Sequence, residues 1–177
     1  MDTLLVVKDL DTVFRFRGPT NGLTVRDFDS DGHDDIIIHH ITNMPGIEEL
    51  IRYSTHSNGF VEVQLFSSFP SSTELQGTGL FYSYHRSGCA DMNWDSDLFF
   101  LDDSMAVRVG NIHGEGCEDI TRTLARISYA ADSGTSDDLV VMDSLVFDAG
   151  CSSGVSKWDF IREYWTANWK EFLESNR

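Results

Sequence analysis

The distribution of β-branched and aromatic residues constrains the fold of this chain more than any other feature. Over most of residues 1–150 they come in short runs that end at Gly, Asp, Asn, Ser or Pro. Runs of about four to eight such residues are typical of strands joined by turns. The predicted strands cover residues 4–8, 12–17, 23–27, 35–40, 48–54, 60–66, 79–85, 97–101 and 105–109. The sequence therefore predicts an all-β fold.

Two turn signals indicate that these strands form an antiparallel meander. Residues 54–59 place Asn-Gly between two strand patterns, and these residues tolerate the positive φ that tight hairpin turns need. Residues 102–104, Asp-Asp-Ser, predict a second hairpin. Residues 121–129 fit a strand or a helix, whereas residues 139–147 favour a strand. We expect a propeller- or barrel-like arrangement.

The pattern changes at Ser156. From there on, apolar residues recur at three- and four-residue spacing, as on one face of an amphipathic helix: Trp158, Ile161, Trp165, Trp169, Phe172 and Leu173. Ser156 and Asp159 have the spacing of a capping box. We expect one domain, in which residues 1–154 form the β domain and residues 155–177 a C-terminal helix packed on it. The alternative is that this helix binds a partner.

The charge of the chain excludes several classes of partner. Its 29 Asp and Glu residues and 13 Lys and Arg residues give a formal net charge of -16. Nucleic acid and anionic lipid both need clustered Lys and Arg, so neither is an expected partner. Strong negative charge favours cations such as Ca²⁺, or a basic protein. Alternatively, the charge only keeps the protein soluble.

The apolar runs of the chain are short. Residues 4–7 and 98–101 are typical examples, and a transmembrane helix needs about 18 apolar residues or more. We therefore expect no transmembrane segment. Asp2, Lys8 and Asp9 do not fit a signal peptide. Either the protein is cytoplasmic, or it is exported and its signal is absent from this chain.

An acidic loop between two predicted strands carries the most specific chemistry. The carboxylates of Asp27, Asp29 and Asp31 alternate, and Gly32 permits a sharp turn. The backbone carbonyl of His33 and the carboxylate of Asp35 then complete a set of oxygen ligands for Ca²⁺. The alternative is an acidic turn that needs no ion, but its carboxylates would repel one another. We expect a calcium site.

This loop resembles the calcium loops of FG-GAP and VCBS repeat proteins, whose pattern is Asp-x-Asp-x-Asp-Gly-x-x-Asp. It departs from an EF-hand because Ile38 replaces the bidentate Glu and because strands flank it. The next acidic cluster, residues 91–97, lacks the Gly and the spacing, so we interpret it as a polar turn. The resemblance implies one possible function, a calcium-stabilised adhesion or carbohydrate-binding module.

The order of features over residues 4–115 resembles a second family more closely. A strand, the Asp-Gly-x-x-Asp loop, a strand, a hairpin at residues 53–63 and a Ser-Gly loop after residues 79–85 follow one another. This order is similar to that of periplasmic lysozyme-inhibitor-like immunity proteins of bacterial antibacterial secretion systems, relatives of the inhibitors of invertebrate-type lysozyme. In such inhibitors the Ser-Gly loop enters the active-site cleft of the enzyme. That family often has Tyr after Ser-Gly, where this chain has Cys89.

The resemblance implies that the protein is a periplasmic or extracytoplasmic immunity protein. It would bind and block a basic, lysozyme-like peptidoglycan hydrolase that acts as a toxic effector. The insertion residues would be Ser87 and Gly88, and the neighbouring candidate contacts are Tyr82, Tyr84, His85 and Arg86.

The three Cys residues allow one disulfide with one free thiol, or three thiols. For an exported protein the preferred pair is Cys89 with Cys117, followed by Cys117 with Cys151. The chain contains no nucleophile elbow, no phosphate-binding Gly loop and no HExxH motif. We therefore name no catalytic residue and expect a binding protein that is not an enzyme.

Overall fold

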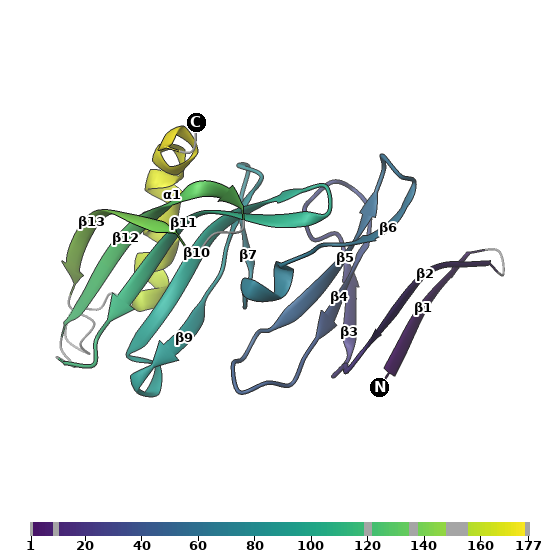
Figure 1. The fold of residues 1–177 in the computed structure, drawn as a ribbon, viewed down its shortest axis with the longest axis horizontal. Coiled ribbons are helices and arrows are strands. Elements are labelled where there is room, and N and C mark those ends of the chain that lie inside the picture. Colours follow the sequence, from purple (N-terminus) through teal and green to yellow (C-terminus); the bar gives the residue numbers. More distant parts are fainter. Residues whose placement is uncertain (1, 9–10, 119–121, 135–137, 148–155, 176–177) are drawn as a thin grey trace. The chain divides into compact units, whose positions relative to one another are not determined.

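The computed structural model describes residues 2–8, 11–118, 122–134, 138–147 and 156–175. Within these residues the chain is mostly strand, with one long helix near the C-terminus (Figure 1). In chain order the elements are β1 (Asp2–Lys8), β2 (Asp11–Gly18), β3 (Leu23–Arg26), β4 (Asp35–His39), β5 (Glu48–Ser54), β6 (Gly59–Glu62), η1 (Phe66–Ser68), β7 (Thr73–Leu75), β8 (Leu80–Tyr82), β9 (His85–Gly88), η2 (Cys89–Asp91), β10 (Asn93–Asp102), β11 (Met105–Glu115), β12 (Thr123–Gly134), β13 (Leu139–Phe147) and α1 (Lys157–Ser175).

The strands form three antiparallel sheets. β1 pairs with β2, a second sheet has the order β3-β4-β5-β6, and a third has the order β13-β12-β11-β10-β8-β7 with β9 also paired to β10. The predicted all-β class with antiparallel strands and a C-terminal helix is confirmed. In the part of the chain that the structure describes, no sheet closes on itself.

The chain divides into two compact units. The first comprises Met1–Ser71 and Leu101–Ala106, the tip of the β10–β11 hairpin, and the second comprises Ser72–Phe100 and Val107–Arg177. The expectation that both belong to one domain stays a prediction. Within the residues described, no helix is both long and apolar enough to span a membrane.

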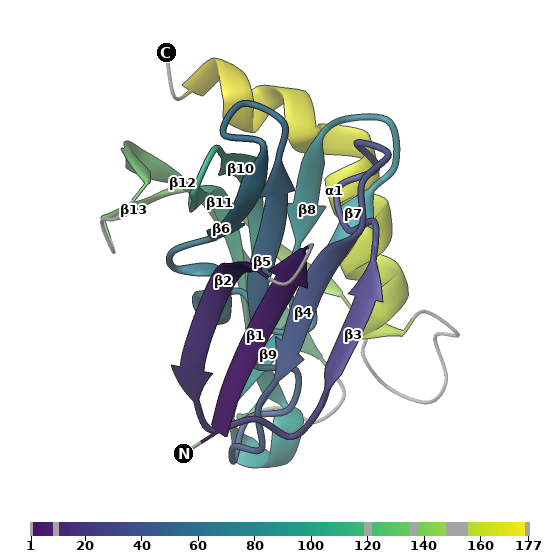
Figure 2. The same cartoon turned by 90° about the vertical axis from the view of Figure 1, so that its right-hand side faces the viewer.

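The core of the first unit lies on the sheet β3-β4-β5-β6. Strand β4 reads Asp-Ile-Ile-Ile-His, and its first four residues are buried, as is typical of a strand covered on both faces. Phe16 of β2 packs with Ile36, Ile38 and Ile51. Figure 2 shows the β1–β2 hairpin of this unit lying in front of that sheet. The predicted hairpin at residues 54–59 joins β5 to β6, with Ser54 opposite Gly59 and a positive φ of 51° at Asn58.

The core of the second unit lies between α1 and one face of the third sheet. Ile161, Trp165 and Phe172 of the helix are at most 1% exposed, and they pack with strand residues of β10, β11 and β12. The indole N–H of Trp165 donates a buried hydrogen bond of 2.9 Å to Ser96 Oγ. The prediction that this aromatic stripe forms core is confirmed for these three residues. Trp158 is 50% exposed.

Two glycines of β11 leave room for core rings, Gly110 for Phe172 of the helix and Gly114 for Trp94 of β10. A Cβ at Gly110 would lie 2.5 Å from the ring of Phe172, and one at Gly114 would lie 2.2 Å from the ring of Trp94. Both distances are shorter than van der Waals contact, so a side chain at either position would displace a core ring. The N-terminus of α1 has the predicted cap, in which the backbone N–H of Asp159 donates to Ser156 Oγ at 3.2 Å.

Two parts of the sequence-based interpretation need revision. Of the ambiguous residues 121–129, residues 123–129 belong to strand β12. The interpretation of residues 91–97 as a polar turn is wrong from Asn93 onward, because β10 begins there. Trp94 and residues 96–99 are buried, so this part of β10 is covered on both faces. Strand β7 was not predicted.

Candidate functional sites

The acidic loop lies in the first unit and connects β3 to β4. Side-chain oxygens of Asp27, Asp29 and Asp35 lie within 4.8 Å of one another. Gly32 has a φ of +91°, a backbone conformation that favours glycine, and it makes the sharp turn that the sequence predicted. The loop is tightened by backbone donors, since the N–H of Asp31 donates to Asp27 Oδ1 at 3.1 Å and that of Gly32 donates to Asp27 Oδ2 at 2.9 Å.

Asp35 anchors this cluster from the start of β4. Its carboxylate is fully buried and accepts hydrogen bonds from the backbone N–H groups of Phe28, at 3.0 Å, and Tyr53, at 2.9 Å. Burial nevertheless outweighs these two bonds, and with the nearby charges of Asp29 and Asp31 it raises the pKa of Asp35 to about 6. A buried carboxylate that is this easily protonated has too little positive charge around it.

Asp29 also has too little positive charge around it. Burial and the charge of Asp31 raise the pKa of Asp29, although Arg52 acts in the opposite direction. Nη1 of Arg52 lies 3.4 Å from Asp29 Oδ2. Arg52 therefore pairs with one of the three clustered carboxylates, and a hard divalent cation could be coordinated by all three.

The loop brings together only part of the predicted ligand set. Asp31 is exposed and is not one of the three clustered carboxylates, and its Oδ1 accepts a hydrogen bond of 2.9 Å from the backbone N–H of His33. The ring of His33 lies against that of Tyr53, with 4.9 Å between the centroids. The carbonyl of His33 as a ligand stays a prediction.

The predicted insertion residues lie at the exposed end of a strand of the second unit, where the chain turns toward β10. Ser87 and Gly88 end strand β9, and both are exposed, as are Arg86 and Ala90. Gly88 has a φ of +144°, and the three residues after it all have positive φ. Such backbone is unfavourable for residues other than glycine, so surrounding contacts must hold it in place.

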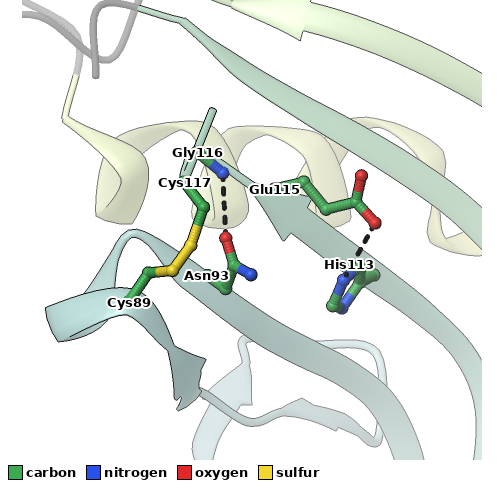
Figure 3. The surroundings of a disulfide bond; sticks show 6 residues. All are labelled: Cys89, Asn93, His113, Glu115, Gly116 and Cys117. Atoms are coloured by element: carbon green, nitrogen blue, oxygen red, sulfur yellow. Dashed lines mark hydrogen bonds and ion pairs between the residues drawn. A yellow bond between two sulfur atoms is a disulfide. The ribbon is translucent and has the colours of Figure 1, made fainter. Parts of the chain in front are cut away.

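One of these contacts is a disulfide. Cys89, directly after Gly88, is bonded to Cys117, with 5.7 Å between the Cα atoms (Figure 3). This is the pair that the sequence analysis preferred, and Cys151 lies outside the described residues. Beside the disulfide, Asn93 Oδ1 accepts a hydrogen bond of 3.1 Å from the backbone N–H of Gly116. Asn93 is also the register partner of Gly88, so the turn is tied to β10 and to the end of β11.

A second set of contacts ties the turn to α1. Nζ of Lys157 lies 2.6 Å from the carboxylate of Asp91 and donates to its backbone carbonyl at 2.9 Å. The hydroxyl of Tyr84 donates to the same carboxylate. The ring of Trp158 lies 3.9 Å from that of Tyr84, and the Lys157 ammonium lies 5.1 Å from the Tyr84 centroid. The bonds from Lys157 and Tyr84 lower the pKa of Asp91 despite burial, which favours the protonated form.

The sequence analysis missed a polar network on the sheet of the second unit. Asp95 lies between two histidines, 2.8 Å from His113 Nδ1 and 3.5 Å from His85 Nε2. Burial favours protonated Asp95, but the hydrogen bonds from His85 and His113 outweigh it and lower its pKa to about 2. The bond to Asp95 raises the pKa of His85. On β11, His113 Nε2 lies 3.5 Å from Glu115 (Figure 3).

Asp97 continues this network inside the unit. Its carboxylate is fully buried, lies 2.8 Å from Arg108 Nε, and accepts a hydrogen bond of 2.8 Å from Asn111 Nδ2. Burial raises the pKa of Asp97, and Arg108 and Asn111 act against that rise. The sequence contains a signal for this network, because Asp95 and Asp97 alternate before the predicted hairpin, and Asn111, His113 and Glu115 alternate after it. Alternate residues of adjacent strands share one face of a sheet.

Comparisons with known proteins find little that is similar. No protein-family model matches the chain, and no curated protein does. Among solved structures, a Xanthomonas type IV secretion system related protein matches with a TM-score of 0.49 and 14% sequence identity. The match covers 68% of this chain and 57% of that chain, so this chain spans less than two thirds of the length of that protein. These comparisons do not show the predicted lysozyme-inhibitor family, which stays a prediction.

Proposed function

We propose that this protein is a calcium-stabilised inhibitor of a lysozyme-like peptidoglycan hydrolase and acts in the periplasm as an immunity protein. The observation that carries the proposal is the exposed segment at Ser87 and Gly88, which is held by a disulfide at Cys89 and an ion pair at Asp91. The resemblance of residues 4–115 to inhibitors with a Ser-Gly loop supports the same assignment.

The braced turn has properties that suit insertion into an enzyme cleft. Small side chains at Ser87 and Gly88 allow the backbone to enter a narrow cleft, and the Ser87 hydroxyl can donate to a catalytic carboxylate. The disulfide of Cys89 and the ion pair of Asp91 restrict the turn before binding. A turn that is already ordered loses less conformational entropy on docking, which favours tight binding.

Charge supports a basic partner. The chain carries a formal net charge of -16, and complementary charge accelerates the encounter of two proteins. Arg86, beside the insertion residues, would make a local contact of the opposite sign.

Calcium would act at the acidic loop of the first unit. Asp27, Asp29 and Asp35 would be its carboxylate ligands, and Asp31 and the His33 carbonyl would complete the set. The bound ion would neutralise the clustered carboxylates and hold β3 and β4 at the loop. We assign it a structural role and no part in a reaction, since we propose that the protein binds its partner without turnover.

The test is inhibition of lytic activity by a loop variant. Partners captured on the immobilised protein are identified by mass spectrometry, and their lysis of peptidoglycan is measured with and without the protein. We expect the protein to inhibit a captured lysozyme-like hydrolase, and we expect Ser87→Arg to reduce this inhibition at least about tenfold, because the larger side chain cannot enter the cleft.

Two comparisons make the test decisive. Ser57→Arg changes an exposed serine in the β5–β6 turn of the first unit and should leave inhibition unchanged. Full inhibition by Ser87→Arg and by a Ser87→Arg, Gly88→Arg double variant would refute the assignment of the turn. Failure of the wild-type protein to inhibit any lysozyme-like hydrolase would refute the function, and turnover of peptidoglycan by the protein itself would show that it is an enzyme.

A further inference from the structure

A groove in the second unit runs between the β7–β8 hairpin and helix α1. It encloses about 430 Å³, within the range of about 300 to 1,000 Å³ that is usual for small-molecule pockets. The helix contributes Arg162, Thr166 and Trp169, which recur at four- and three-residue spacing and therefore share one face of α1. The groove shares no lining residue with the turn at Ser87 and Gly88.

The floor of the groove is apolar and fixed by packing. Leu75 is only 6% exposed, and Tyr82 and Trp169 are partly buried against the core of the unit. Lys170, which does not line the groove, places its ammonium 5.4 Å from the centroid of the Trp169 ring. The two aromatic rings are therefore held before a ligand arrives, which reduces the entropy lost on binding.

The rim of the groove carries planar polar groups. Gln76 Nε2 donates to Glu74 Oε2 at 2.8 Å, and Arg162 Nη2 donates to Asp159 Oδ1 at 2.6 Å. These bonds orient the amide, the carboxylate and the guanidinium. A side-chain amide has two donors and one acceptor oxygen, and a guanidinium has five donors, so each group can bond a ligand in addition.

The charge of the groove selects the class of ligand. Its lining contains one carboxylate, Glu74, and one guanidinium, Arg162, and the charge of Arg162 is already paired with Asp159, so the lining does not favour an anionic ligand. Phosphate ligands need several converging cations, and the polar rim does not suit a lipid chain. A neutral ligand with hydroxyl groups at its edge and C–H groups on its face fits both floor and rim. Weakly positive C–H groups are attracted to the negative face of an aromatic ring.

We propose that this groove binds a short saccharide, with one sugar ring stacked on Trp169 and its hydroxyls bonded to Glu74, Gln76 and Arg162. This site is independent of hydrolase inhibition and of the calcium loop. It gives the chain a second binding surface, formed by a helix and a hairpin of the second unit.

The test is an NMR titration of the ¹⁵N-labelled full chain. The indole N–H signals of the Trp residues are followed while chitotriose, cellotriose or maltotriose is added. We expect the Trp169 signal, assigned by its loss in Trp169→Ala, to shift saturably with at least one of the three sugars. The Trp169→Ala variant should bind that sugar about tenfold more weakly or worse, by calorimetry, because it loses the stacking surface.

Two further variants complete the design. Trp158→Ala removes an exposed indole on the same helix but outside the groove and should bind like the wild type. Gln76→Ala changes an exposed residue of the hairpin and should weaken binding several-fold even if Trp169→Ala does not fold. The proposal is overturned if none of the sugars shifts the Trp169 signal in the millimolar range. It is equally overturned if Gln76→Ala binds as tightly as the wild type.

Discussion

Aspartates gather at two places in this molecule, and the two clusters compensate their negative charge differently. In the second unit each aspartate of the series has a basic side chain beside it: Asp91 has Lys157, Asp95 has His85 and His113, and Asp97 has Arg108. In the first unit the side-chain oxygens of Asp27, Asp29 and Asp35 cluster, and Arg52 pairs with Asp29. The aspartates of the second unit are therefore paired within the protein, whereas the clustered carboxylates of the first unit are those that we propose to bind Ca²⁺.

The largest effect on stability is expected from removing the charge of Asp97 in the second unit. Asp97→Asn keeps the shape of the side chain but leaves the Arg108 guanidinium without its anion. Breaking such a buried pair typically destabilises a protein by 3 kcal/mol or more, and we expect a loss of about 3 kcal/mol in the free energy of unfolding. Urea unfolding, in the presence or absence of Ca²⁺, measures it. Asp103→Asn, in the exposed hairpin turn, is the control and should change little.

The carboxylate cluster of the first unit, Asp27, Asp29 and Asp35, should respond to Ca²⁺ instead. At about a hundredfold excess over its dissociation constant, Ca²⁺ should stabilise the wild type by about 3 kcal/mol and raise its melting temperature by several degrees. Asp29→Asn should change stability little in EDTA, since it removes a carboxylate whose ionisation is unfavourable, and should lose most of the gain from Ca²⁺. Identical melting curves of the wild type in EDTA and in millimolar Ca²⁺ would remove the proposed distinction between the clusters.

The pH dependence of stability should identify the histidine pairs of the second unit. Folding lowers the pKa of Asp95 from 3.8 to about 2, so its contribution is present above pH 3.8 and is lost as pH falls toward 2. Folding raises the pKa of His85 above 6.5, so its contribution is present below pH 6.5 and is lost as pH rises through the folded-state pKa. The stability difference between wild type and Asp95→Asn should therefore be largest between these limits.

The difference in unfolding free energy between the wild type and Asp95→Asn should reach on the order of 2 kcal/mol, measured by urea unfolding. It should decrease both in stronger acid and at mildly alkaline pH. A difference that stays constant with pH would mean that the charge of His85 is not coupled to that of Asp95.

The smallest effect on stability is expected at Lys157, where the ion pair with Asp91 is partly exposed. Lys157→Met keeps the aliphatic stem and should change the free energy of unfolding by less than about 1 kcal/mol. It should nevertheless increase hydrogen exchange in residues 86–91, and under the proposed function it should weaken hydrolase inhibition. Lys170→Met, on the same helix, is the matched control. Unchanged exchange in this segment would show that the disulfide alone orders the turn.

Local patterns predicted the elements of the fold well, because the residues concerned prefer the same structure in most surroundings. The Ile36–Ile38 run, the Asn58-Gly59 turn and the capped helix after Ser156 are examples. Prediction was less successful at residues 91–97, where Asp, Asn and Ser have turn preferences. There the burial of Trp94 outweighs the local preference for a turn. The contacts of Asp95 and Asp97 with basic side chains have the same effect.

The two candidate binding sites, the acidic loop and the groove, also differ in whether the sequence predicted them. The candidate calcium site was visible in the sequence because all its proposed ligands lie within nine consecutive residues, from Asp27 to Asp35, and a short loop can bring them together by itself. The groove was not visible, because its residues come from a hairpin near residue 75 and from a helix near residue 165. No spacing rule joins segments so far apart in the chain.

The sequence by itself determined the all-β class, the C-terminal helix and a loop whose carboxylates repel one another unless a cation joins them. Only the tertiary structure decided which charges are already neutralised. It placed Lys157 beside Asp91 and Arg108 beside Asp97, and it gathered three carboxylates of the acidic loop, of which Asp29 pairs with Arg52. The physical reason is that charge repulsion within a loop is a local property, whereas its compensation depends on which distant side chains packing brings within reach.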